Sequence, residues 1–122
     1  NLPSGVLLNT AAMIPSPGQG VIAVQSRLHD HETTTLVSAL DHYQTRICAE
    51  TERAFLARLG RDCNLPAGAY ATFDEHAITV LGMLGSTDET TAERMEMEGT
   101  DPSVGTRLAH ALMERIHSET RQ

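Results

Sequence analysis

The sequence contains no lysine and no tryptophan, and only 3% of its residues are aromatic. All nine basic residues are therefore arginines. The absence of lysine excludes a lysine Schiff base and a Walker phosphate-binding loop within this chain. The scarcity of rings requires a core of Leu, Val, Ile, Ala and Met, and a hydrophobic content of 40% is enough to build one.

The charge balance and the hydrophobic runs exclude two further kinds of partner. The formal net charge is −7, so we expect no cationic surface for nucleic acid or for anionic membranes. No apolar run is long enough to span a membrane, and the first residues lack the regions of a signal peptide. The missing initiator Met is what a fragment or a processed chain would show. Because two cysteines in an acidic chain fit a reducing compartment, we expect a cytoplasmic protein with Cys48 and Cys63 unpaired.

Residues 1–41 do not form an obvious unit with the rest of the chain. Residues 14–20 (IPSPGQG) combine prolines that fix φ with glycines that permit positive φ, which indicates a tight turn. The apolar run at 21–24 predicts a short strand buried on both faces. Residues 30–40 predict a short capped helix. We interpret residues 1–41 as the end of one domain, a hinge, and a segment that returns to an incomplete α/β domain.

Residues 42–122 have the pattern of one compact domain. Apolar residues at three- and four-residue spacings predict a long helix that begins near Asp41 and ends at Gly60. A last helix is predicted to begin at Asp101-Pro102. Between these helices the sequence predicts strands at 67–73, 78–84 and 92–98. The predicted fold class is α+β, with a three-stranded antiparallel sheet and helices packed on one of its faces.

Cys63 is the residue with the most distinctive surroundings. It follows the end of the long predicted helix and precedes the first predicted strand, so it stands on an exposed corner between two packed elements. A covalently held group can project from such a corner without disturbing a core. A thiolate is a soft nucleophile near neutral pH, which suits it to capture a carbon electrophile. From the residues alone, a loop cysteine with no role is the alternative, and Cys48 is predicted to be a small buried hydrophobe.

Three blocks in order give the sequence a resemblance to the porphobilinogen deaminase family, also called the hydroxymethylbilane synthases. They are residues 14–20, then 36–42 (LVSALDH) with 51–55 (TERAF), then 62–71 (DCNLPAGAYA). These blocks resemble the family's hinge, the start of its third domain, and its cofactor loop with the following strand. The sequence departs from the family at Arg61-Asp62, where the family has two glycines. Longer side chains there are expected to crowd or re-aim the loop.

The resemblance implies a covalent cofactor and three contact residues. Cys63 would carry dipyrromethane as a thioether, formed when the thiolate captures the azafulvene that porphobilinogen gives by losing ammonia. Gln19 and Gly20 would contact the cofactor or the growing chain, because the Gln19 amide can both donate and accept; a tight turn without such contacts is the structural alternative. Arg53 would pair either with pyrrole carboxylates or with a protein acid.

The resemblance also implies a transferase of tetrapyrrole biosynthesis, the route to porphyrins and heme. The family condenses four porphobilinogen units into a linear tetrapyrrole and releases ammonia. Because its catalytic aspartate lies in the first two domains, we expect no catalytic residue here and no activity of the isolated chain. The expected partners are porphobilinogen and the growing oligopyrrole, in a monomeric full enzyme whose fragment can self-associate. The alternative is a non-catalytic binding or dimerisation module, or a remnant of the enzyme.

The six histidines do not have the spacing of a metal site. His29 and His31 lie two residues apart, and His110 and His117 lie seven apart on one predicted helix face. Neither spacing makes a close chelate. The sequence therefore predicts solvated histidines and no bound metal.

Overall fold

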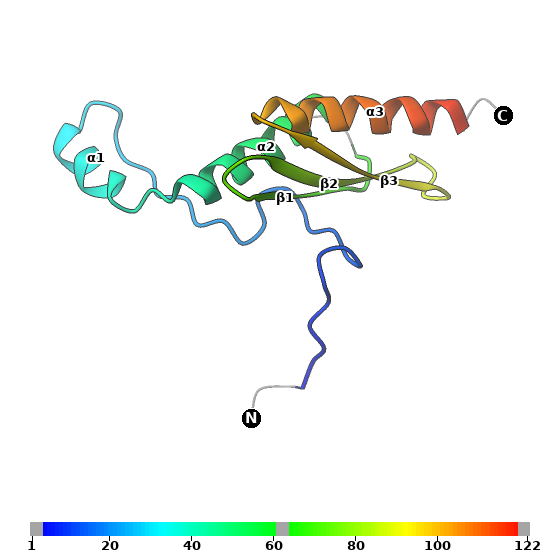
Figure 1. The fold of residues 1–122 in the computed structure, drawn as a ribbon, viewed down its shortest axis with the longest axis horizontal. Coiled ribbons are helices and arrows are strands. Elements are labelled where there is room, and N and C mark those ends of the chain that lie inside the picture. The colour runs from blue at the N-terminus through cyan, green and yellow to red at the C-terminus, as the bar shows by residue number, and fades with distance from the viewer. Residues whose placement is uncertain (1–3, 61–63, 120–122) are drawn as a thin grey trace.

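The structure is a computed structural model that describes residues 4–60 and 64–119. Two helices cover one face of a three-stranded antiparallel sheet, and a third helix projects away from this layer (Figure 1). In chain order the elements are α1 (His31–Ser38), α2 (Tyr43–Leu59), β1 (Ala67–Phe73), β2 (Ile78–Gly85), β3 (Ala92–Gly99) and α3 (Ser103–Glu119). The α+β class and all three predicted strands are confirmed, each to within one residue at its ends.

Local sequence signals explain where the helices begin and end. The His42 side chain accepts a hydrogen bond from the Thr45 N–H and so caps the start of α2. Gly60 follows the last turn with a φ of 90°, a value that glycine adopts without steric cost. The Asp30 carboxylate caps α1 in the same way, through the N–H of Thr33.

The core lies between the two packed helices and the sheet. Its largest fully buried side chain among the described residues is Phe55, and the partly buried Met95 and Met97 of β3 pack against the core. Two glycines let the layers approach each other. A Cβ on Gly82 would lie 2.7 Å from Cδ2 of Leu108, and a Cβ on Gly105 would overlap the Thr51 carbonyl oxygen of α2. At Gly82 the backbone of β2 therefore packs against side chains of the helices, and at Gly105 the backbone of α3 packs against the backbone of α2.

The strand predicted at 21–24 is not formed. This segment has no regular structure, and Ile22 is 90% exposed. A strand needs a neighbouring strand and an apolar layer to cover it, and neither lies beside this segment among the described residues. The short helix is confirmed as α1, but it buries no residue, and the apolar side chains of Leu36 in the helix and Leu40 just after it face solvent.

No helix in residues 4–60 and 64–119 combines the length and the apolar character that crossing a membrane requires.

Candidate functional site

The predicted hinge packs against the sheet at the edge of β1. We call residues 11–18 the N-terminal strap. Ile14 is buried, and the Pro15 carbonyl accepts a hydrogen bond of 3.0 Å from the Ala69 N–H of β1. Only glycine fits beneath the strap at position 68, since a Cβ there would lie 2.9 Å from the Ile14 carbonyl oxygen. The hinge is thus joined to the strand that follows the Cys63 loop in sequence.

A second attachment comes from the long helix. Glu52 of α2 is only 6% exposed, and its two oxygens accept hydrogen bonds from different segments. Oε2 accepts from the Gly18 N–H at 2.6 Å, and Oε1 accepts from the Ala71 N–H at 2.9 Å. One carboxylate therefore links helix, strap and strand.

The Glu52 carboxylate affects the pKa of a neighbouring thiol. Cys48 lies one helical turn earlier and is half-buried. Burial raises the pKa of the Cys48 thiol, and the nearby Glu52 carboxylate raises it further. Both causes keep this thiol protonated, so the prediction of a small hydrophobic side chain agrees with its surroundings.

A third attachment lies on the far strand of the sheet. The Arg94 guanidinium of β3 donates to the carbonyl oxygens of Ala11 and Ala12, both at 3.0 Å. Arg94 is paired with Met83 across the strands, and Met83 is paired with Gly68. The strap therefore runs across the helix-free face of the sheet, from β3 to the edge of β1.

The two predicted contact residues of the turn are exposed. Gly18 and Gly20 adopt φ values of 78° and 83°, so the backbone reverses around Gln19. The Gln19 Oε1 atom accepts a hydrogen bond from the Ser16 N–H at 3.2 Å. Its NH₂ group makes no hydrogen bond to the described residues, so it is free to donate outward.

The structure describes Arg53 but not Cys63. Arg53 is exposed on α2 next to Glu52, and it makes no ion pair with any described residue. Its pairing with pyrrole carboxylates or with a protein acid stays a prediction. Cys63 lies outside the described residues, together with Arg61 and Asp62, so its assignment as the cofactor attachment point stays a prediction.

Glu52 and Arg94 make contacts that were not predicted from the sequence. A signal for Glu52 was present, because it lies on the same helical face as Cys48 and Phe55. An acidic residue on the buried face of a helix needs hydrogen-bond partners from elsewhere in the fold. No comparable signal exists for Arg94, whose partners are backbone carbonyls distant in sequence.

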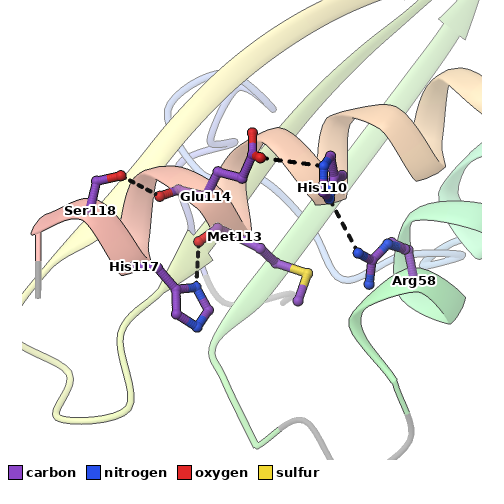
Figure 2. A pocket seen from close by; sticks show the side chains of 6 residues that line it. All are labelled: Arg58, His110, Met113, Glu114, His117 and Ser118. Carbon is purple, nitrogen blue, oxygen red and sulfur yellow. Dashed lines mark hydrogen bonds and ion pairs between the residues drawn. The ribbon is translucent and has the colours of Figure 1, made fainter.

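A pocket of about 600 Å³ lies between the end of α2 and the outer face of α3 (Figure 2). Arg58 Nη2 donates to Nδ1 of His110 at 3.2 Å, and Nε2 of His110 lies 3.4 Å from Glu114 Oε1. This pattern fits a neutral imidazole that carries its proton on Nε2. The Nδ1–H group of His117 donates a hydrogen bond of 2.6 Å to the Met113 carbonyl oxygen. The polar groups that line this pocket largely satisfy one another.

The described histidines and acids do not gather around a possible ion. Across residues 4–60 and 64–119, no cluster of three or more His, Cys, Asp or Glu side chains is arranged to hold a metal. His110 and His117 are both exposed, as are His29 and His31.

The chain is similar to known proteins over most of its length. A family model described as "Porphobilinogen deaminase, C-terminal domain" matches residues 46–114, which run from α2 into α3. A porphobilinogen deaminase of Chlorobium chlorochromatii is 40% identical over 72% of this chain. Those of Chlorobium luteolum and Brevibacillus brevis are 36% and 39% identical over 90% and 82% of it. The chain spans only 28%, 39% and 33% of the length of these three relatives, respectively.

Proposed function

The chain belongs to the porphobilinogen deaminase family, and from this membership we propose that it is the C-terminal, cofactor-bearing part of a hydroxymethylbilane synthase. The complete enzyme would be a transferase of porphyrin and heme biosynthesis. It would condense four porphobilinogen units into a linear tetrapyrrole and release ammonia at each step. The observation that carries the proposal is the family match over α2, the sheet and most of α3, the elements on both sides of Cys63.

We assign the covalent attachment of dipyrromethane to Cys63. The cofactor would supply a primer for chain growth that remains on the protein when the product is released. The described residues fit such a group, because the Gln19 amide and the Arg53 guanidinium both present donors that no described residue uses. Gln19 and Gly20 would contact the pyrrole chain, and Arg53 would bind its carboxylates. Since Arg61-Asp62 replace the family's two glycines, the loop would hold Cys63 differently from its relatives.

The division of labour within the complete enzyme follows from the family. The catalytic aspartate and most of the substrate arginines would come from the other domains, so this chain alone would be inactive. Residues 42–122 would form the cofactor-bearing domain, and residues 1–41 would complete an α/β domain. The enzyme would act in the cytoplasm, with porphobilinogen and the growing oligopyrrole as its partners.

The intact mass of the complete natural protein tests this proposal, with the modified peptide mapped by fragmentation. We expect the mass increment of a dipyrromethane on the peptide that contains Cys63. Cys63→Ala should remove the increment and the formation of tetrapyrrole, and Cys48→Ala should remove neither. An active protein with an unmodified Cys63 would contradict the assignment.

A second function, as a dimerisation module, is favoured by one observation. Apolar side chains outside the core stand in solvent, among them Leu7, Ile22 and Leu28, which are each at least 85% exposed. Such residues favour self-association of the isolated chain. Sedimentation equilibrium of the 122-residue chain decides this point, since a concentration-independent monomer mass would argue against it.

A further inference from the structure

Glu52 is a buried carboxylate whose partners are unusual. Among the described residues it bonds only to backbone N–H groups, from Gly18 and Ala71, which lie 34 and 19 residues away in sequence. Within the described part of the chain no Arg or His forms an ion pair with it. Burying a carboxylate without a cation is unfavourable, so these two bonds have to offset a substantial desolvation cost.

The two bonds need both carboxylate oxygens. A glutamine at position 52 has one acceptor oxygen, and its NH₂ group would face an N–H donor at the other position. An aspartate is shorter by one methylene, so it cannot span the same two partners without a movement of the backbone. The site therefore selects glutamate by its chemistry and its length.

The position of the turn depends on this residue. Pro15, directly before the turn, attaches the strap to β1 through the Ala69 N–H. Among the described residues, Gly18 is attached only through the Glu52 carboxylate and the hydrogen bonds of the turn itself. Loss of the Gly18–Glu52 bond would leave the turn free to pivot about Pro15.

We propose that Glu52 is a positioning residue, which fixes the turn at residues 16–20 against β1 and so sets where Gln19 and Gly20 meet the pyrrole chain. The functional part of this inference rests on the proposed function, in which these two residues contact the cofactor or the growing chain. The attachment of the turn is independent of that function. A displacement of about 1 Å in a contact residue can cost up to about 100-fold in rate, so a loosened turn should slow catalysis without removing it.

The attachment is tested by NMR on the 122-residue chain. In Glu52→Gln we expect the amide signals of Gly18, Gln19 and Ala71 to shift, and the Gly18 amide to exchange with solvent at least about ten times faster. Core amides remote from this site, such as that of Leu112 in α3, should keep their positions. The matched control is Glu50→Gln on the same helix, whose exposed carboxylate lies 3.8 Å from the Arg46 guanidinium. Unchanged turn signals in Glu52→Gln would overturn the inference.

The positioning role is tested in the complete natural protein by the rate of tetrapyrrole formation and by the loading of Cys63. We expect Glu52→Gln to lower kcat about ten-fold at a temperature where circular dichroism shows the variant to be fully folded, with Cys63 still loaded, and the control Glu50→Gln to keep its kcat. Normal turnover in a variant whose turn signals have moved would overturn the positioning role. A wild-type protein with neither cofactor nor turnover would instead overturn the proposed function, while the NMR result would still decide the attachment.

Discussion

Replacing Gly105 by alanine tests the closest contact between the two packed helices. In the interior of most helices this change is stabilising, by up to about 1 kcal/mol, because alanine restricts the unfolded chain. At position 105 the new Cβ would overlap the Thr51 carbonyl oxygen and lie 3.0 Å from the Phe55 nitrogen. Both are backbone atoms of α2, which cannot rotate away as a side chain can. The helices must therefore separate.

Separation of the helices loosens the contacts around the Phe55 ring. Overpacking of this kind costs about 3 kcal/mol where the obstructing atoms are rigid. After subtraction of the alanine gain, we expect a net loss of about 2 kcal/mol in the free energy of unfolding. For a cooperative unit of this size, the loss corresponds to a fall in Tm of about 10 °C.

Urea and thermal unfolding followed by far-UV circular dichroism measure this loss. The matched control is Thr106→Ala at the next position of α3, which is exposed and gains helix propensity without a clash. It should be neutral or slightly stabilising. If Gly105→Ala proves as stable as this control, the helices are not in contact at residue 105 and the reasoning fails.

Three other substitutions or conditions probe separate parts of the fold. Phe55→Ala removes a fully buried ring from the core, so we expect the free energy of unfolding in urea to fall by about 4 kcal/mol. The control Leu56→Ala, at an exposed position, should change it negligibly. Arg94→Ala removes both bonds to the start of the strap, so limited proteolysis should cut residues 4–13 faster while Tm changes little. Hydrogen bonds from the Ala77 and His76 N–H groups lower the pKa of Asp74 below 3.8. The stabilisation that this depressed pKa gives is therefore present above pH 3.8 and is lost as the pH falls through the folded value; an NMR titration of the carboxyl carbon that gave an ordinary pKa would contradict it.

The packed half of the fold was predictable because its signals are local. The alternation of Met95 and Met97 with glutamates predicts β3, and the glycine after Leu59 predicts the end of α2. The segment at 21–24 was predicted wrongly, because an apolar run gives no information on whether a neighbouring strand exists. Periodicity indicates which residues would be stabilised by burial. Whether they are buried depends on the presence of a neighbouring strand and of an apolar layer that covers them.

The candidate site was less predictable for a different reason. The exposed positions of Gln19 and Gly20 follow from the turn signal, but the two attachments of Gly18 and Ala71 to one carboxylate join three segments distant in sequence. Hydrogen bonds to backbone atoms leave no pattern in side-chain types. Only the presence of an acidic residue on the buried face of α2 pointed to them.

The strap also determines how residues 19–42, which contain α1, are connected to the helix–sheet layer. Residues 19–42 leave the helix–sheet layer at Gly18, which is bonded to α2, and they rejoin it at His42, which caps the same helix. The segment is therefore held at two points, and α1 packs against no other element of the described chain. A segment attached at two points can still rotate about the line that joins them. Any larger structure built on residues 19–42 would rotate relative to the helix–sheet layer about an axis set by the start of α2 at His42 and by Glu52 in its middle.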